Sequence, residues 1–161
     1  MKSRIVKTFA IAALATTLAA CSSTKSSVDT VTTPGTQTGA VMDPFNPNSP
    51  LAQQRSVFFG FDQYSVDEQY LPLVQMHAQY LAANGQQRIR VEGNTDARGS
   101  SEYNLALGQR RSVATAQQLV NRGVNGAQIE AVSFGKERPA AQGWSEEAHA
   151  QNRRADINYI R

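Results

Sequence analysis

The stretch VEGNTDARGSSEYN, residues 91–104, changes character halfway along its length. Its first residues are typical of the end of a buried strand, and its last residues are typical of the first turn of a helix. The residues between them mostly hydrogen-bond or bend the backbone: Asn94, Thr95, Asp96, Arg98 and Gly99. The stretch therefore predicts a strand-to-helix turn, and it leaves open whether this turn also binds a ligand.

The segments on either side of the turn support this prediction. Before it, residues 88–93 alternate apolar Ile89 and Val91 with charged residues, as a half-buried strand does. After it, a helix is predicted from about Ser101 to Arg122, and it should stop at Gly123. The buried stripe of this helix is expected to include Leu105, Ala116, Leu119 and Val120.

Upstream, residues 57–61 form a short apolar run, VFFGF, that predicts a buried strand. Residues 65–68, SVDE, have the form of a helix-capping box, and apolar positions at helical spacing follow as far as Leu81. Pro72 does not fit the interior of that helix. Either Ser65 begins a short turn and the long helix starts near Pro72, or one longer helix is kinked at Pro72.

Downstream, the pattern predicts three more elements. Residues 129–134 form a strand between glycines, Ser145 caps a short helix through Ala148, and residues 155–160 alternate like a last strand. The order β-α-β-α-β-α-β favours helices packed on a sheet. The predicted fold class is α/β (α+β), a two-layer sandwich of helices packed on a mixed β-sheet.

The N-terminal residues predict a secreted protein. Lys2, Arg4 and Lys7 precede an apolar run over residues 8–20, which is the pattern of a cleaved signal peptide, residues 1–20. A transmembrane anchor is disfavoured because the run is short. Residues 21–55 are rich in Ser, Thr, Pro, Gly and Asn, so we expect a flexible tether. The folded domain is expected to span residues 56–161.

The signal peptide ends in Leu18-Ala19-Ala20-Cys21, which resembles the bacterial lipobox. The resemblance implies cleavage before Cys21 and acylation of this residue, the only cysteine in the chain. A single cysteine cannot form an internal disulfide, and lipidation accounts for it. Ser22 follows, and in this resemblance a residue other than Asp at that position implies sorting to the outer membrane.

The charge balance excludes one class of partner. The full chain has 16 basic and 13 acidic residues, but Lys2, Arg4 and Lys7 leave with the signal peptide. The mature protein then has 13 of each, so its formal net charge is zero. This balance gives no support to nucleic-acid binding.

Catalytic groups are scarce in the sequence. His77 is expected to be a buried histidine with its hydrogen bonds satisfied, and His149 is expected to be solvated. No metal-binding or nucleophile motif is found, so neither a cofactor nor a metal is implied. One enzymatic alternative stays open, because Asp62, Glu92 and Asp96 could converge to cleave a glycosidic bond.

A binding site is better supported. Asn104, Leu107 and Arg111 are spaced to share one face of the second helix, near Asp96 at its start. Asp accepts hydrogen bonds from an ammonium, and Arg binds a carboxylate, so together they suit a ligand that carries both groups. The alternative is that Asp96 and Arg111 pair with each other or cap the backbone. The spacing alone leaves these two interpretations even.

Several motifs, in a fixed order along the chain, indicate a resemblance to a known family. They are Phe59-Gly60-Phe61-Asp62, Asn94-Thr95-Asp96-Ala97-Arg98-Gly99, Glu102-Tyr103-Asn104, Leu107-Gly108-Gln109-Arg110-Arg111, residues 133–139 and Asn152-Arg153-Arg154. Together they cover most of residues 56–161, and this part of the chain resembles the OmpA-like peptidoglycan-binding domain. With the lipobox and the tether, the whole chain resembles a lipid-anchored member of that family.

The resemblance implies a site for the meso-diaminopimelate of the peptidoglycan stem peptide, whose side chain ends in an ammonium and a carboxylate. Asp96 would bind the ammonium and Arg111 the carboxylate. The resemblance also implies that further residues line or shape the pocket: Phe61, Asp62, Thr95, Asn104, Leu107 and Asn152. Of Arg153 and Arg154, one is expected to bind and the other to pair structurally, and Arg153 is the one placed among the site residues.

Two positions depart from the pattern of the family. Gly108 stands where many relatives have Ser, and Ala97 stands where the most similar relatives have an acidic residue. Both are expected at the rim of the pocket.

The implied function is a non-enzymatic link between the outer membrane and the cell wall, with the domain in the periplasm. The implied partners are peptidoglycan and the periplasmic propeller protein of the Tol system, TolB, which would compete for an overlapping surface. Two alternatives remain, a wall-cleaving enzyme and a pure protein-interaction module.

Overall fold

The computed structural model describes residues 42–161. The predicted signal peptide, the lipidated Cys21 and most of the predicted tether lie outside these residues. The described elements are α1 (Pro50–Gln53), β1 (Ser56–Phe58), the 3₁₀ turn η1 (Glu68–Tyr70), α2 (Leu71–Ala83), β2 (Arg88–Asn94), α3 (Ser101–Val120), the 3₁₀ turn η2 (Gly126–Gln128), β3 (Ile129–Gly135), α4 (Glu146–Asn152) and β4 (Arg154–Ile160).

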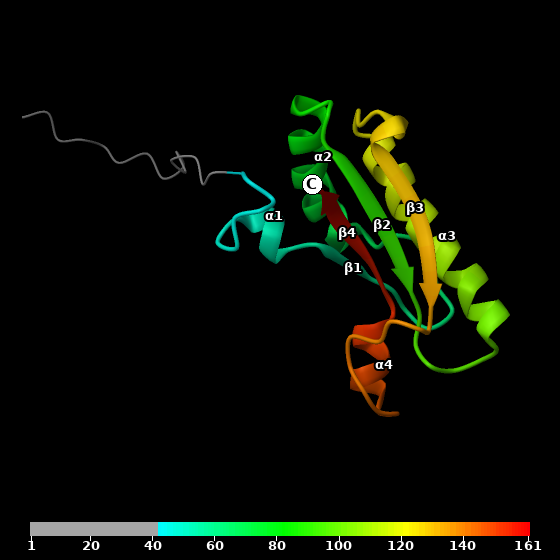
Figure 1. Cartoon of the computed structure of the whole chain (residues 1–161). Coiled ribbons are helices and arrows are strands. Elements are labelled where there is room, and N and C mark those ends of the chain that lie inside the picture. The colour runs from blue at the N-terminus through cyan, green and yellow to red at the C-terminus, as the bar shows by residue number, and fades with distance from the viewer. Residues whose placement is uncertain (1–41) are drawn as a thin grey trace, which may run out of the picture. The chain divides into compact units, whose positions relative to one another are not determined.

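The four strands form one mixed sheet in the order β1-β4-β2-β3. β2 and β3 are parallel and α3 connects them, whereas β4 is antiparallel to both β1 and β2. Helices α2 and α3 run beside each other along the sheet (Figure 1). The prediction of helices packed on a mixed β-sheet is therefore confirmed.

The core lies between the sheet and these two helices. It contains Ile89 and Val91 of β2 and Ile157 of β4, packed against Val74 and Leu81 of α2. The alternation predicted for residues 88–93 follows from this, because every second side chain of β2 faces the helices. On the opposite face, charged side chains form ion pairs near solvent, including Arg90 with Glu130 and Arg138 with Glu92.

The predicted buried stripe of α3 was partly wrong. Leu119 is buried, but Leu105 is 53% exposed and Val120 is 39% exposed. The face that packs inward carries mostly small and polar residues: Asn104, Leu107, Gly108, Arg111, Ser112, Thr115 and Leu119. The prediction from hydropathy failed in the first half of the helix, because the residues buried there are mostly polar or small rather than apolar.

A pair of glycines brings α3 onto β2. A Cβ atom added to Gly93 would lie 1.8 Å from the carbonyl oxygen of Gly108, so no side chain fits between these two backbones. A Cβ atom on Gly108 would lie 2.3 Å from Ser133 Oγ and 2.8 Å from the Gly93 carbonyl oxygen. Gly108 is therefore buried at the helix–sheet contact, and the expectation that it lies at the rim of the pocket was wrong.

The folded domain starts earlier than the expected boundary at residue 56. Leu51 in α1 is completely buried, and the ring of Phe45 packs edge-on against Tyr159 of β4 at 6.3 Å. Arg55 donates a hydrogen bond to the carbonyl of Pro44 and lies 5.8 Å from the centre of the Tyr159 ring. The segment from Pro44 to Arg55 is thus part of the domain, because Leu51 is buried and both Phe45 and Arg55 contact Tyr159 of β4.

The region around Pro72 follows the first of the two predicted alternatives. Asp67, rather than Ser65, caps the 3₁₀ turn η1, and α2 begins at Leu71 with Pro72 in its first turn, where the missing N–H costs nothing. The strand predicted over residues 57–61 is shorter than expected. β1 ends at Phe58, and Phe61 lies in a loop with 63% of its surface exposed.

The two histidines differ in how well they were predicted. His77 is buried and satisfied, as expected, because Nε2 donates to the Gln54 carbonyl at 2.7 Å and Nδ1 accepts from the Tyr159 hydroxyl at 2.8 Å. His149 was expected to be solvated, but it is buried beneath Trp144, whose ring lies 6.0 Å away and nearly perpendicular.

None of the helices within residues 42–161 combines the length and apolarity needed to cross a membrane.

Candidate functional site

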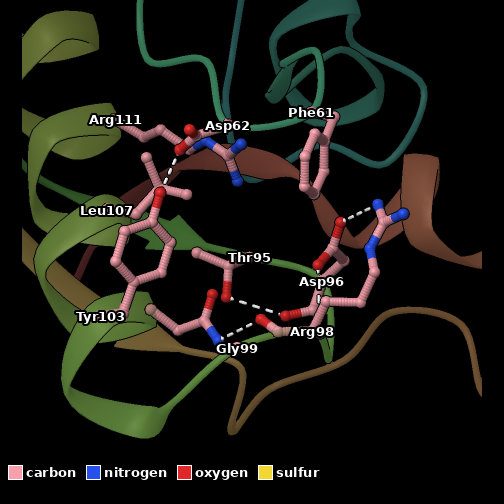
Figure 2. Close-up of a pocket in the computed structure, with 10 residues that line it drawn as sticks. Phe61, Asp62, Thr95, Asp96, Arg98, Gly99, Tyr103, Leu107 and Arg111 are labelled. Atoms are coloured by element: carbon pink, nitrogen blue, oxygen red, sulfur yellow. Dashed lines mark hydrogen bonds and ion pairs between the residues drawn. The ribbon is translucent and has the colours of Figure 1, made fainter.

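A cavity of about 210 Å³ opens at the carboxyl end of β2, beside the first turns of α3. Its wall comes from three parts of the chain: the loop after β1, the β2–α3 turn and α3 itself. The lining residues are Phe61, Asp62, Thr95, Asp96, Arg98, Gly99, Tyr103, Asn104, Leu107 and Arg111. Figure 2 shows Asp96 with Arg98 on one side of this cavity and Arg111 with Asp62 on the other.

The β2–α3 turn is held in place by its own hydrogen bonds. The Thr95 N–H donates to the Gly135 carbonyl at 2.8 Å, which ties the turn to the end of β3. Asn104 donates from Nδ2 to the carbonyls of Arg98 at 2.7 Å and Ser100 at 3.1 Å. Gly99 has a φ of 89°, which favours glycine at this position. The turn is therefore fixed before any ligand arrives.

Asp96 is buried and held by two arginines. Its Oδ2 lies 2.5 Å from Arg98 Nη2 and 3.4 Å from Arg153 Nη1, and its Oδ1 accepts from the Arg98 N–H at 3.2 Å. Burial alone would raise the pKa of Asp96, but the hydrogen bonds from Arg98 and Arg153 and the charge of Arg98 outweigh it. The net result is a pKa below the ordinary value, so Asp96 is an anion at neutral pH.

Arg111 is completely buried, and three backbone carbonyls hold it. Its Nε donates to Gln63 at 2.8 Å, Nη1 to Asn94 at 2.9 Å and Nη2 to Gly60 at 3.1 Å. Burial lowers the pKa of Arg111 to about 10, which still leaves it charged at neutral pH. A guanidinium has five N–H bonds, so two, one on each terminal nitrogen, remain for a ligand in the cavity that Arg111 lines.

The two charges share the cavity without contacting each other. Within residues 42–161, no hydrogen bond or ion pair joins Asp96 to Arg111. The alternative in which they neutralise each other was therefore wrong. The alternative of backbone capping was right in part, because Arg111 caps three carbonyls and Asp96 accepts from one backbone N–H.

The loop after β1 forms the mouth of the cavity. Asp62 has a φ of 55°, the only positive φ of a non-glycine residue among those described, and its carboxylate accepts a hydrogen bond from the Tyr103 hydroxyl. The guanidinium of Arg98 lies 4.4 Å from the centre of the Phe61 ring. Phe61 and Arg98 thus cover the same side of the site.

Two residues expected at the site, Asn152 and Arg153, are not in the wall of the cavity. Asn152 accepts from the N–H groups of Ala140 and Ala141 at 2.7 and 3.0 Å and returns a hydrogen bond to the Ala141 carbonyl at 2.8 Å. Arg153 donates to Phe59, at 3.0 Å, and supports Asp96 from behind. Arg154 pairs with Asp156 at 2.9 Å. Arg154 thus has the structural pairing expected of one of the two arginines, and Arg153, the one placed among the site residues, also pairs within the protein.

Seven of the expected site residues line the cavity: Phe61, Asp62, Thr95, Asp96, Asn104, Leu107 and Arg111. The sequence prediction missed Arg98, Gly99 and Tyr103 as members of the wall. All three stand within the signature motifs, so their position between Asp96 and Asn104 was the available signal. Their roles depend on contacts with Asp96, Lys136 and Asp62 that the spacing does not specify.

The arrangement suits binding better than hydrolysis. A glycoside hydrolase needs a carboxylic acid whose pKa is raised, so that it can donate a proton. The pKa of Asp96 is instead lowered by its arginine partners. Glu92, the third carboxylate considered, pairs with Arg138 at 3.4 Å and does not line the cavity.

Comparison with known proteins agrees with this geometry. A model of the OmpA family matches residues 58–153, which include every residue of the cavity wall. The chain belongs to the OmpA family. The match covers more than half of the chain and runs from β1 to the end of α4.

Curated relatives in this family are named peptidoglycan-associated lipoproteins. The protein from Pasteurella multocida (strain Pm70) is 36% identical over 156 residues, covering 97% of this chain and 99% of the relative. The protein from Pseudomonas putida is 42% identical over 123 residues, covering 76% and 74%. The first match extends well beyond the domain into the N-terminal part of the chain.

Solved structures show the same fold. The peptidoglycan-associated lipoprotein from Burkholderia pseudomallei superposes with a TM-score of 0.70 at 57% identity, covering 73% of this chain and 98% of that chain. The C-terminal domain of Helicobacter pylori MotB superposes with a TM-score of 0.60 at 21% identity, covering 66% and 84%. The second likeness is a likeness of fold alone.

Proposed function

We propose that this chain is a non-enzymatic envelope protein that binds the diaminopimelate-containing stem peptide of peptidoglycan. One observation carries the proposal: Asp96 and Arg111 are both buried, face one cavity and do not contact each other. A buried charge without an opposite charge in contact is costly, so the Arg111 site favours an anionic group from outside the chain. The relatives' name, peptidoglycan-associated lipoprotein, supports the wall as its source.

The two buried charges of the cavity complement the ammonium and the carboxylate that the diaminopimelate side chain carries at its end. A carboxylate can accept the two remaining N–H bonds of Arg111, one from each terminal nitrogen. An ammonium can bind Asp96, which is already an anion, if Arg98 moves aside. Of the two arginines at Asp96, Arg98 is the one whose guanidinium can move into solvent, because its side chain is 37% exposed and that of Arg153 is 9% exposed.

The proposal includes an anchor. Residues 1–20 are a cleaved signal peptide, Cys21 carries lipid in the outer membrane, and residues 22–41 form the tether to a periplasmic domain that begins near residue 42. The names of the relatives, as lipoproteins, support this organisation. The protein would then link the outer membrane to the wall, and TolB, the propeller protein of the Tol system, would compete for the mouth of the same site during envelope constriction and cell division.

The test is co-sedimentation of the purified domain with isolated sacculi. Asp96→Asn keeps the shape of the side chain and removes its charge, so we expect binding to weaken by at least about thirtyfold, the effect of leaving one buried charge unpaired. Glu130→Gln is the matched control, because Glu130 forms an exposed ion pair with Arg90 outside the cavity. Equal sedimentation of wild type and Asp96→Asn, both folded by circular dichroism, would remove Asp96 from the site.

The same incubation separates the alternatives. Release of soluble muropeptides that depends on Asp62 or Asp96 would favour a wall-cleaving enzyme. A pure protein-interaction module would bind neither sacculi nor the isolated stem peptide. The anchor is tested by Cys21→Ala, which should move the protein from the membrane fraction to the soluble periplasmic fraction.

A further inference from the structure

A second cavity, of about 200 Å³, adjoins the first. Its wall includes Thr95, Lys136, Gln142, Trp144 and Asn152. Thr95 lines both cavities, and Lys136 of the second donates a hydrogen bond at 3.0 Å to the carbonyl of Gly99, which lines the first. The two cavities therefore share part of their walls.

Trp144 is part of the wall of this cavity. It is 77% exposed, more than any other large hydrophobic residue that the structure describes. Its ring is held edge-to-face by the buried ring of His149 at 6.0 Å, a contact that leaves most of the indole accessible. An exposed indole in the wall of a cavity offers a ligand a large apolar face beside a polar N–H group.

Hydrogen bonds hold the loop that carries Trp144 in place. Asn152 makes three hydrogen bonds to the backbone of Ala140 and Ala141, at distances of 2.7 to 3.0 Å. Ser145 caps α4 immediately after the tryptophan, and its hydroxyl accepts from the Ala148 N–H at 3.2 Å. The loop lies at the end of the sheet where the arrows of β2 and β3 finish (Figure 1). Trp144 is thus presented on a rigid support, which reduces the entropic cost of binding.

We propose that Trp144 and this second cavity form a subsite for a sugar ring of the wall glycan. A pyranose ring has an apolar C–H face, which can stack on the indole, and a rim of hydroxyl and acetamide groups, which can bond to the side chains of Lys136 and Gln142. The inference rests on the proposed function, because the sugar is the one to which the stem peptide in the first cavity is attached.

The composition of this cavity favours a saccharide over a protein partner. Apart from Trp144, most of the larger side chains in its wall are polar: Thr95, Lys136, Gln142 and Asn152. Protein-binding hot spots place their aromatic anchors in a broader apolar surface. One aromatic ring among hydrogen-bonding groups matches the amphipathic surface of a sugar.

The experiment compares two ligands by calorimetry: the diaminopimelate stem peptide alone, and the same peptide carrying its disaccharide. Wild type should bind the disaccharide-peptide about five- to tenfold more tightly, the range expected for one well-placed aromatic contact. Trp144→Ala should bind both ligands equally, with its affinity for the free peptide unchanged. Trp144→Phe should keep part of the preference.

Fluorescence gives a second readout, because Trp144 is the only tryptophan in the chain. Its emission should shift with the disaccharide-peptide and stay the same with the free peptide. The inference is overturned if wild type binds both ligands equally, or if Trp144→Ala weakens both to the same extent, which would mean a structural or protein-binding role. If wild type binds neither ligand, the proposed function fails, and the subsite fails with it. Asp96→Asn should lower the affinity for both ligands, whereas Trp144→Ala should lower the affinity for the disaccharide-peptide alone, so the two variants distinguish the two cavities.

Discussion

Arg98 Nη2 lies 2.5 Å from Asp96 Oδ2, so the anionic end of the cavity already has a cationic partner. The guanidinium also lies over the exposed ring of Phe61, with its Nη1 3.4 Å from Glu146. A ligand ammonium must compete with Arg98 for Asp96. In this structure Arg98 therefore stands in for the cation that the proposed function assigns to the site.

Arg98→Ala tests this competition. We expect the affinity for the diaminopimelate stem peptide to increase about three- to fivefold, the value of one partly exposed ion pair that no longer has to be broken. Calorimetry of wild type and variant measures the difference. Arg90→Ala, which removes an exposed ion pair with Glu130 outside the cavity, should leave the affinity unchanged. Weaker binding by Arg98→Ala would mean that Arg98 contacts the ligand itself.

The contact between Gly93 and Gly108 predicts an unusually sensitive position in β2. Gly93→Ala places a methyl group against the backbone of α3, so the helix must move, and we expect a loss of about 3 kcal/mol of unfolding free energy. Gly85→Ala is the control, because a Cβ atom there meets nothing within 4 Å. Denaturant unfolding of both variants checks the prediction, and similar stabilities would contradict it.

Because His77 is buried, we expect the free energy of unfolding to depend on pH. Burial lowers the pKa of His77 to about 4, despite the opposing effect of its hydrogen bond to Gln54, and the charge of Arg55 lowers it further. The folded state therefore disfavours protonation. The contribution of neutral His77 to the free energy of unfolding is fully present above the pKa of about 6.5 that histidine has in the unfolded chain. This contribution falls, by up to about 3 kcal/mol, as the pH drops towards 4.

Urea unfolding at several pH values measures the effect. His77→Gln cannot titrate in this range, so its stability should lose this slope between pH 6.5 and 4. The same slope in both proteins would assign the pH dependence to other groups, among them the carboxylate of Asp96.

Leu51 tests the start of the domain. It is completely buried although it lies in the segment expected to be a tether, so Leu51→Ala should cost about 2–5 kcal/mol of unfolding free energy. Leu105→Ala is the matched control, because Leu105 is 53% exposed on α3 and should change stability by at most about 0.5 kcal/mol. A protein shortened to residues 56–161 should be destabilised at least as much as Leu51→Ala. Full stability of the shortened protein would restore the boundary at residue 56.

The sequence by itself determined the order of the main strands and helices and most of the residues that line the cavity. The alternation of Ile89 and Val91, the cap at Ser145 and the glycine Gly123 beyond α3 are local signals, and each was found where the pattern placed it. The motifs from Phe61 to Arg111 likewise identified seven residues that line one cavity, because a shared family signature records a shared fold.

The tertiary structure alone decided which partners these residues have. Arg111 binds the carbonyls of Gly60, Gln63 and Asn94, which come from two other segments of the chain, and no spacing along α3 specifies them. The exposure of Leu105, the burial of Leu51 and the position of Trp144 beside the cavity are equally non-local. Periodicity reports which face of an element is apolar, whereas burial and charge pairing depend on which other elements pack against that face.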